Sequence, residues 1–433
     1  MLKISGAVLA VIAATSVVAA PKAASKAAKP AAAPTVVELE FVQNLGADKG
    51  EQVAKLVERF NAANPQIKIT LTQRDWADGK QPALMLLNED DEDRLVASGR
   101  YKPLWDVMRI GGQPLKTFTP PKFVSPRPLD AKGRLAALPV AMSSPVLLYN
   151  KDALAKVGVD PANTPKTWRE WQDVLGKLYT SGVACPYTTV EPAWIFVENV
   201  STWHNQPFTV LSGKQEVLAA NGLMQVKHLA MMSSWYKARY LHIFGRGDEA
   251  MAPFAQGACA VLTAPSDAYA TLARQAKFDI GVANFPYHGD AYGAPQNTVA
   301  DGSSLWFGAG KTTAEYKAAA KFVSFWLTPE SQVEWQVDAG YLPLNTAGVL
   351  ATTSKLLDDK LAAQQVAIAE LTNKPTTIAS LATIYGRRPG VRAILDEEIE
   401  AVWANKKPAK QALDDAVSRA RAGDVGRAAA PRP

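Results

Sequence analysis

A strand–helix–strand unit near the start of the chain constrains the fold more than any other feature. Residues 36–42, VVELEFV, predict a β-strand, and residues 67–73, IKITLTQ, alternate apolar and polar side chains in a second one. The apolar residues between them recur at i, i+3, i+4 and i+7: Val53, Leu56, Val57 and Phe60. Asn64-Pro65 ends that helix. Strands joined by a helix run parallel, so we expect an α/β protein with a largely parallel sheet.

The stretch 143–171, SSPVLLYNKDALAKVGVDPANTPKTWREW, predicts a strand followed by two capped helices. Asn150 is a suitable N-cap for the first helix, and Thr167 with Glu170 forms the T-x-x-E capping box of the second. Before it, 119–129 holds four prolines and predicts a loop. Further strands are expected at 82–88, 259–265, 278–286 and 303–310, and helices dominate near the end of the chain.

The N-terminus has the pattern of a secretory signal peptide. Lys3 precedes a short apolar run, and small residues stand near Ala19 and Ala20. An N-terminal anchor helix is the alternative, which the short run and its small-residue end disfavour. The segment that follows, PKAASKAAKPAAAPT, is rich in Ala, Lys and Pro and predicts a flexible leader. We therefore expect an exported protein.

The net charge of +6 comes from the two ends of the chain. Residues 1–34 hold four lysines and no acid, and residues 419–433 hold four arginines and one aspartate. The rest of the chain holds 39 basic and 40 acidic residues and is nearly neutral. A nucleic-acid-binding module needs a basic face, so a nucleic-acid partner is not expected.

The two cysteines, Cys185 and Cys259, are compatible with one disulfide or with two buried thiols. The four histidines are scattered without the spacing of metal ligands: His204, His228, His242 and His288. We expect neither a metal nor another cofactor.

Several segments together resemble the extracellular solute-binding proteins that feed bacterial ABC importers, most closely the periplasmic branch that binds glycerol 3-phosphate. They are RFNAANP (59–65), YKPLWDV (101–107), SPVLLYNKDALAKVGVDP (144–161), PKTWREW (165–171), VENVSTWHNQPF (197–208), APQN (294–297), GSSLWF (302–307), GYLP (340–343) and VRAILDEEIEAVW (391–403). The resemblance implies two α/β lobes joined by crossing segments, with a ligand cleft between them. It also implies lobe closure about hinges near 143–150 and 296–303.

On this resemblance the chain divides into seven parts. They are a signal peptide (1–20), a leader (21–35), the first part of the N-lobe (36–145), the first part of the C-lobe (146–295), a return to the N-lobe and hinge (296–345), a helical part of the C-lobe (346–420) and a tail (421–433).

The resemblance also implies a set of ligand-binding residues for a small phosphate ester. They are Trp76, Glu89, Ser143, Trp194, Gly302, Tyr341 and Arg392, with Ser144 as the runner-up to Ser143. Arg392 is the expected phosphate ligand, because a guanidinium can donate two parallel hydrogen bonds to the oxygens of a phosphate. Its alternative role is an i,i+4 ion pair with Asp396 on a surface helix.

Three departures from the family pattern bear on the ligand. The segment between Trp76 and Pro82 is shortened, which cuts back one rim of the cleft. Pro265 replaces a ligand-binding serine, and Ser266 is the expected substitute, shifted by one position. Glu191 replaces a tryptophan of the cleft wall. A carboxylate there repels a phosphate dianion and attracts a cation, so we expect a glycerophosphodiester with a cationic head group to be tolerated or preferred.

The expected function is therefore reversible capture of glycerol 3-phosphate or a glycerophosphodiester such as glycerophosphocholine by a monomer in the periplasm. The expected partners are the membrane permease and ATPase subunits of an importer. A sugar- or oligosaccharide-binding protein of the same class is the first alternative, and a periplasmic hydrolase is the second. An ATPase is excluded, because the phosphate loop suggested by GAGKTT (308–313) requires a glycine where Leu305 stands.

Overall fold

The structure is a computed structural model that describes residues 36–113, 115, 132, 134–212, 215–345, 358–377, 379 and 390–422. The expected signal peptide and leader, the whole of the predicted loop 119–129 and the end of the tail lie outside the described residues. Within these ranges no helix combines the length and the apolar composition that a membrane span requires.

The first lobe is built on a five-stranded sheet with the order β2-β1-β3-β12-β4. Its strands are β1 (Val37–Gln43), β2 (Ile67–Thr72), β3 (Leu84–Leu87), β4 (Leu138–Ser143) and β12 (Asp301–Phe307). β1 pairs in parallel with β2 and β3, as the strand–helix–strand pattern predicts. β12 is antiparallel to β3 and β4, so the sheet is mixed. The reason is that β12 enters this sheet from the second lobe and not through a βα crossover.

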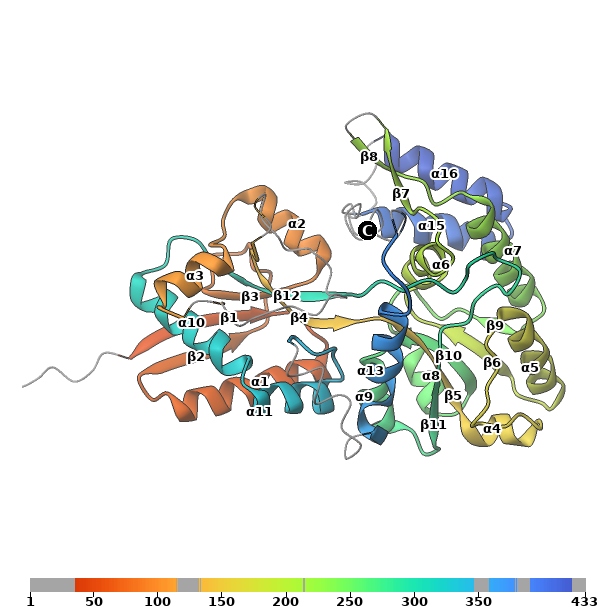
Figure 1. Cartoon of the computed structure of the whole chain (residues 1–433), viewed down its shortest axis with the longest axis horizontal. Helices are drawn as coiled ribbons and strands as arrows, with labels where there is room; N and C mark the ends of the chain where they lie inside the picture. The colour runs from red at the N-terminus through yellow and green to blue at the C-terminus, as the bar shows by residue number, and fades with distance from the viewer. Residues whose placement is uncertain are drawn as a thin grey trace, which may run out of the picture. The chain divides into compact units, whose positions relative to one another are not determined.

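Helices surround this sheet (Figure 1). They are α1 (Ala47–Ala63), α2 (Glu89–Ser98), α3 (Leu104–Ile110), α10 (Thr313–Trp326), α11 (Pro329–Glu334) and the π-helix η2 (Trp335–Ala339). Four of them, α1, α3, α10 and η2, bury apolar side chains in the core of this lobe. The four apolar residues that predict α1 are buried, and α1 ends before Asn64. Phe60 of α1 packs edge-on against Phe322 of α10, with ring centroids 5.1 Å apart.

The second lobe is built on a five-stranded sheet with the order β11-β5-β10-β6-β9. Its strands are β5 (Pro145–Asn150), β6 (Cys185–Thr189), β9 (Leu241–His242), β10 (Cys259–Pro265) and β11 (Ile280–Ala283), and β7 (Thr209–Ser212) with β8 (Gln215–Leu218) forms a separate hairpin. The helices are α4 (Lys151–Lys156), α5 (Trp168–Thr180), η1 (Trp194–Asn199), α6 (Val200–Trp203), α7 (Leu223–Lys237), α8 (Met251–Ala255), α9 (Ala268–Gln275), α13 (Asp358–Leu371), α15 (Val391–Trp403) and α16 (Ala409–Arg421).

Both predicted helix starts in 143–171 are confirmed. The side chain of Asn150 accepts a hydrogen bond from the Ala153 N–H at the start of α4. Thr167 and Glu170 form both hydrogen bonds of the capping box of α5. Local side-chain chemistry therefore directs the chain out of β5 and into the second lobe.

Three segments pass between the lobes and are hydrogen-bonded to one another where they cross. Ser144 Oγ donates to Thr298 Oγ1 over 2.8 Å, which joins the β4–β5 connection to the segment before β12. The Leu342 N–H donates to the Met142 carbonyl over 2.8 Å. These contacts place the crossing segments side by side, where the hinge is expected.

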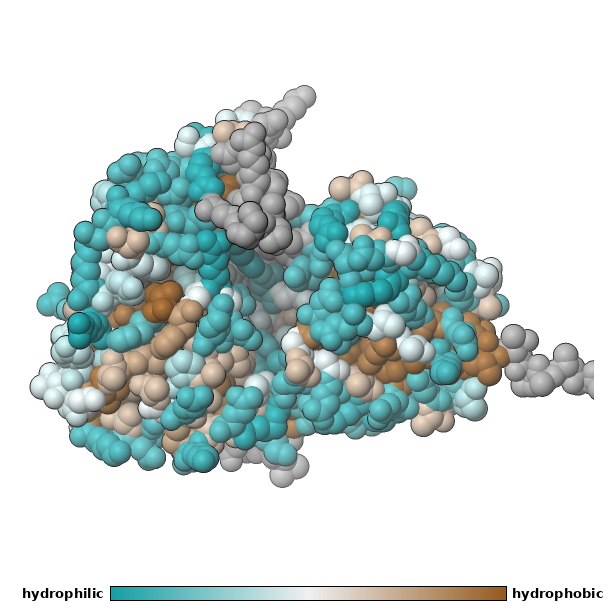
Figure 2. All heavy atoms as spheres, turned by 180° about the vertical axis from the view of Figure 1, so that it is seen from behind, coloured by the Kyte–Doolittle hydropathy of each residue, from teal (hydrophilic) through white to brown (hydrophobic). Residues whose placement is uncertain are grey.

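The surface seen in Figure 2 is mostly hydrophilic, with hydrophobic side chains in smaller patches on both lobes. Large hydrophobic side chains are exposed at single positions such as Leu223 and Tyr292, while the bulk of the apolar side chains lies in the cores of the two lobes.

Cys185 and Cys259 form a disulfide between the parallel strands β6 and β10. This resolves the choice between a bridge and two thiols. The bridge closes a loop between residues 74 positions apart, and its sulfurs lie in the core of the second lobe.

Replacing both cysteines with alanine is expected to lower the free energy of unfolding by about 4 kcal/mol, because the open loop regains conformational entropy in the unfolded chain. Denaturant unfolding with and without reductant measures it. The reduced wild type should match the double variant, and equal stability of oxidised wild type and variant would contradict this role for the disulfide.

Three of the four histidines, which sequence spacing left unconnected, form a buried chain. His204 donates from Nδ1 to the Val200 carbonyl (2.7 Å) and accepts at Nε2 from the His288 N–H (2.8 Å), and His288 Nε2 lies 3.1 Å from His228 Nδ1. Only a neutral imidazole can donate at one nitrogen and accept at the other. Burial lowers the pKa of His204 to about 4 and that of His288 to about 3, and it lowers the pKa of His228 well below its usual value.

Acid is expected to destabilise the protein through this chain. A histidine whose pKa is lowered in the folded state destabilises the protein once the pH falls below its unfolded pKa of about 6.5. From there toward pH 4, each such histidine lowers the free energy of unfolding by about 1.4 kcal/mol per pH unit. Thermal unfolding between pH 7 and 4 should show a shallower pH dependence for His204→Gln than for the wild type. His242→Gln, at a partly exposed position, should keep the wild-type dependence. Equal slopes in all three proteins would contradict this role.

Candidate functional site

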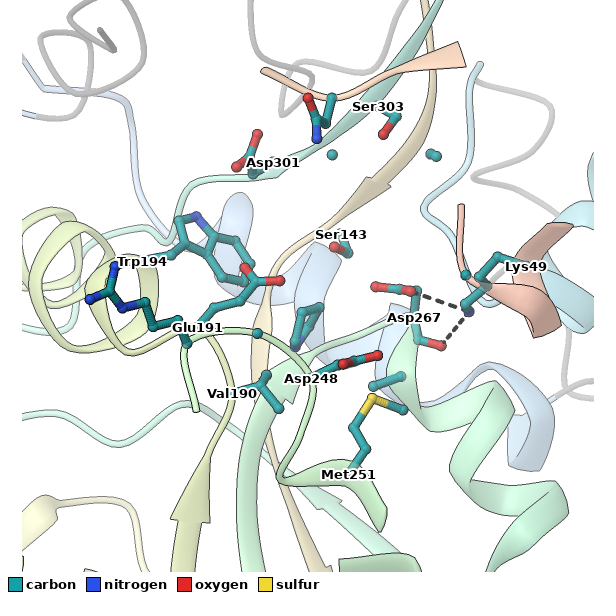
Figure 3. A pocket seen from close by; sticks show the side chains of 18 of the residues that line it. Lys49, Ser143, Val190, Glu191, Trp194, Asp248, Met251, Asp267, Asp301 and Ser303 are labelled. Atoms are coloured by element: carbon teal, nitrogen blue, oxygen red, sulfur yellow. Dashed lines mark hydrogen bonds and ion pairs between the residues drawn. The ribbon is translucent and has the colours of Figure 1, made fainter. Parts of the chain in front are cut away.

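A cavity of about 1030 Å³ is lined by segments of both lobes. The first lobe contributes the start of α1, the ends of β4 and β12 that meet at the crossing, and Tyr341. The second contributes residues 190–194, residues 246–252 and the starts of α9 and α15. Figure 3 shows side chains from these segments around one shared space.

Six of the residues predicted to bind ligand line this cavity. They are Ser143, Glu191, Trp194, Gly302, Tyr341 and Arg392. They come from widely separated parts of the sequence and were predicted through the family resemblance. That all six line one cavity supports the prediction that they belong to one site, and their role as ligand contacts stays a prediction.

Of the other three predicted residues, Trp76 and Ser266 are not among the described lining residues. Trp76 is buried beside Met85 and Trp306, and its Nε1 donates to Asp91 Oδ1 over 3.3 Å. Ser266 is fully buried; its N–H donates to the Ser144 carbonyl over 2.8 Å, and its Oγ accepts from the Ser144 N–H over 3.4 Å. Glu89 begins α2, and its side chain lies outside the described residues.

Gly302 occupies a position that only glycine can fill. Its φ is +151°, and a Cβ built there would lie 1.8 Å from the Ala141 carbonyl oxygen. The backbone of β12 therefore runs against β4 at the cavity wall without a side chain between them.

Arg392 lies in the first turn of α15 and forms ion pairs with acids of both lobes. Its Nε and Nη2 donate to Glu198 Oε2 of η1 over 3.0 and 2.9 Å, and its Nη1 donates to Asp301 of β12. Asp396, the pairing partner in the alternative interpretation, accepts a hydrogen bond from the Ala193 N–H over 3.1 Å. The guanidinium also lies 5.8 Å from the ring centre of Trp194. Arg392 thus faces the cavity and not the solvent side of the helix.

The cavity lining is rich in acids. Its acidic residues are Asp48, Glu191, Asp248, Glu249, Asp267, Asp301 and Asp396, and its basic residues are Lys49, Arg246 and Arg392. Each of the three cations has an acidic partner: Lys49 pairs with Asp267, Arg246 with Glu400, and Arg392 with Glu198 and Asp301. The described lining therefore has seven acids to three cations. The cations are paired, and so are three of the acids: Asp48 with Arg274, Asp267 with Lys49 and Asp301 with Arg392.

Two of these acids hold protons more tightly than carboxyl groups in water. Burial raises the pKa of Glu191 to about 7; nearby Arg392 lowers it, while Asp301 and Asp267 raise it. Burial likewise raises the pKa of Asp396 to about 7, against the hydrogen bond from the Ala193 N–H. Protonation limits the repulsion among these acids near neutral pH, and a bound cation would favour their ionised forms.

The segment that carries Glu191 and Trp194 has unusual backbone geometry. Glu191 adopts a positive φ of 45°, and Trp194 begins the π-helix η1. Backbone strain and π-turns often mark functional sites. Sequence periodicity does not separate a π-turn from an α-helix, so this feature could not be predicted.

Sequence reasoning also missed several residues of the lining. Lys49, Asp248 and Asp301 were not singled out, and Asp396 was considered only as a partner of Arg392. The signal available for Asp301 was its position directly before Gly302 in DGSS.

The chain matches the family model described as bacterial extracellular solute-binding protein over residues 55–364. It is 36% identical over 401 residues to the sn-glycerol-3-phosphate-binding periplasmic protein UgpB of Salmonella typhimurium, a match that covers 89% of this chain and 92% of that protein. UgpB of Escherichia coli O1:K1 matches with the same identity and coverage.

Solved structures share the fold at lower identity. UgpB from Mycobacterium tuberculosis in complex with glycerophosphocholine matches with a TM-score of 0.72 at 19% identity, over 89% of this chain and 98% of that one. Maltose-bound MalE3 from T. maritima matches with a TM-score of 0.71 at 16% identity, over 89% and 99%. The expected two-lobed binding-protein fold is confirmed. The chain therefore belongs to the bacterial extracellular solute-binding proteins, a family of binding proteins and not of enzymes.

Proposed function

We propose that this chain is the periplasmic substrate-binding component of an ABC importer and captures a glycerophosphodiester with a cationic head group, such as glycerophosphocholine. It is exported by its signal peptide, acts as a monomer and delivers the ligand to permease and ATPase subunits. The observation that carries the choice of ligand is the charge of the cavity. Its three cations are paired, and four acids line it beside the three that form ion pairs: Glu191, Asp248, Glu249 and Asp396.

The phosphate charge separates the two candidate ligand types. A phosphate monoester carries close to two negative charges at neutral pH, whereas a diester carries one. A choline or ethanolamine head adds one positive charge, so the diester enters the acidic cavity with no net charge. Coulomb repulsion with Glu191 and Asp301 is then smaller, and attraction to the head group is gained.

One end of the cavity suits the phosphate. Arg392 supplies a guanidinium, and Ser143 supplies a hydroxyl that lies at the cavity wall in Figure 3. The bare backbone at Gly302 lets a ligand approach β12 closely. The diester anion can share Arg392 with Asp301 without displacing the buried ion pair to Glu198.

The other part of the cavity suits a cation. Figure 3 shows the carboxyl groups of Glu191 and Asp248 around the same space, with Asp267 beside them and paired with Lys49. The indole of Trp194 adds an aromatic wall beside Glu191. Carboxylates together with an aromatic ring are the groups that hold quaternary ammonium ions in proteins.

A sugar is the second candidate. A cavity of about 1030 Å³ is larger than a glycerol phosphate requires, and carboxylates accept hydrogen bonds from sugar hydroxyls as well. An uncharged sugar gains hydrogen bonds but no Coulomb attraction from the excess of acids, which is why the cationic diester is favoured.

The ligand is tested by calorimetry with glycerophosphocholine, glycerol 3-phosphate and maltotriose on the wild type and on Glu191→Gln. We expect the wild type to bind the choline diester most tightly. The substitution keeps the shape of Glu191 and removes its charge, so the ratio of diester to monoester affinity should fall about tenfold, equivalent to about 1.4 kcal/mol.

Glu51→Gln is the matched control, because Glu51 is an exposed acid of α1 outside the cavity lining. It should leave all three affinities unchanged. Tightest binding of maltotriose would favour the sugar candidate, and an unchanged affinity ratio in Glu191→Gln would refute the role of that carboxylate.

Proton release should accompany binding of the choline diester. The cation of the head group lowers the pKa of Glu191 from its ligand-free value of about 7, and it acts in the same direction on Asp396, whose pKa is also about 7. Affinity is therefore fully present above pH 7 and lost as the pH falls below it. The loss reaches about tenfold if the bound cation lowers the pKa of Glu191 from about 7 to about 6. Calorimetry in buffers with different ionisation enthalpies counts the protons.

Glu191→Gln should release fewer protons than the wild type. Glycerol 3-phosphate brings negative charge and should release none or take protons up. Proton uptake with the choline diester would contradict a cation beside Glu191.

A further inference from the structure

The start of α1 reaches from the first lobe to α9 in the second. The apolar face of α1 packs in the core of the first lobe through Val53 and Leu56, and α9 packs in the core of the second through Ala268 and Leu272. Asp48 and Lys49, in the first turn of α1, contact α9 and the residue before it directly.

The ammonium group of Lys49 has its donors occupied by the protein. Its Nζ lies 3.2 Å from Asp267 Oδ2, donates to the Asp267 carbonyl over 2.9 Å and donates to the Ala339 carbonyl. An ammonium has three N–H donors, so these three partners use them all. Lys49 lines the cavity, and Figure 3 shows it turned toward Asp267. It is therefore a connector between lobes and not a ligand for an anion.

Asp48 makes the second connection. Its carboxylate accepts from Thr271 Oγ1 over 2.5 Å and from Arg274 Nη2 over 2.8 and 2.7 Å. Arg274 also donates from Nη1 to the Asp338 carbonyl of η2, which packs in the first lobe, over 3.1 Å. The side chains of two adjacent residues thus bind successive turns of α9.

The backbones of the two lobes also touch at this point. A Cβ built on Gly340 would lie 2.7 Å from the Asp267 carbonyl oxygen and 2.9 Å from Ala270 Cβ. The φ of Gly340 is +80°, a conformation that favours glycine. The side-chain contacts of Asp48 and Lys49 therefore lie around a place where the backbones of the two lobes are already in contact.

A ring predicted to contact ligand is part of the same cluster. Lys49 Nζ lies 4.9 Å from the ring centre of Tyr341, directly beside Gly340 in the chain. The ring stacks on Trp335 with centroids 5.4 Å apart. Lys49 thus holds Tyr341 against its own lobe while it binds the other lobe through Asp267.

We propose that Asp48 and Lys49 form an interlobe clasp with Asp267, Thr271 and Arg274. The clasp raises the ligand-free population of the arrangement in which both lobes line the cavity, so that the closure implied by the family resemblance needs less of the binding energy of the ligand. The clasp is made entirely of protein groups, so it acts without ligand. A protein that already populates its binding-competent arrangement binds more tightly, because the apparent dissociation constant is the intrinsic one divided by the competent fraction. Asp48 and Lys49 are positioning residues that set affinity without touching the ligand. This inference rests on the proposed function only for the choice of ligand in its affinity test.

The test compares the wild type with Asp48→Asn and Lys49→Met. Spin labels on cysteines placed at Lys80 in the first lobe and Lys237 in the second, both exposed, report the distance between the lobes. The two native cysteines are joined to each other and leave the introduced ones free to react. Both variants should show longer or broader distances than the wild type without ligand and the wild-type distance at saturating glycerophosphocholine. Their dissociation constants should rise about three- to tenfold.

Lys55→Met is the matched control. Lys55 pairs with Glu51 on the exposed side of the same helix and does not reach the second lobe. It should change neither the distance nor the affinity. A thermal unfolding scan of each protein verifies that the variants are folded.

Two results would overturn the clasp. Unchanged ligand-free distances in both variants would show that these contacts do not hold the lobes. Weaker binding with unchanged ligand-free distances would show that Lys49 or Asp48 contacts the ligand directly. Because the distance is measured without ligand, failure of glycerophosphocholine to bind would refute the proposed function and leave the test of the clasp intact.

Discussion

The ion pairs of Arg392 determine the charge of the cavity. Glu198 is almost fully buried in η1, and a buried acidic side chain is costly unless it is paired. Arg392 provides that partner from α15 and extends to Asp301 on β12, so one guanidinium joins two elements of the second lobe to a strand of the first. Its charge is largely used within the protein, and only part of it is available to a ligand.

The same holds for the other two cations of the lining. Lys49 pairs with Asp267 and donates to two backbone carbonyls, and Arg246 donates to both carboxylate oxygens of Glu400. Glu191 and Asp396 face the cavity, and burial raises the pKa of each to about 7. Repulsion from Asp301, Asp267 and Asp396 adds to the pKa shift of Glu191, and repulsion from Glu400 adds to that of Asp396. A ligand that brings a positive charge relieves this repulsion, whereas one that brings two negative charges increases it. The choice of ligand thus follows from how the protein satisfies its own charges.

Local features of the fold could be predicted from the sequence because their causes are local. The capping box of Thr167 and Glu170 depends on residues three positions apart, and the parallel pairing of β1 with β2 follows from one intervening helix. The antiparallel entry of β12, the buried histidine chain and the disulfide depend on segments that only the folded chain brings together. At the site, resemblance identified Arg392 but not its partners Glu198 and Asp301, which lie 194 and 91 positions away. Trp76 was expected at the cleft, and its packing against Met85 and Trp306 depends on tertiary contacts that the sequence pattern does not show.

If the acids of the cavity select the ligand, positive charge on the head group must matter more than its shape. The most direct test compares glycerophosphocholine with the 3,3-dimethylbutyl ester of glycerol phosphate, in which carbon replaces the quaternary nitrogen and the shape is kept. Calorimetry on the wild type at pH 8, where Glu191 is mostly ionised, should show the choline ester binding at least about tenfold more tightly. Equal affinities for the two esters would contradict this selection and show that the acids of the cavity do not act on the head group.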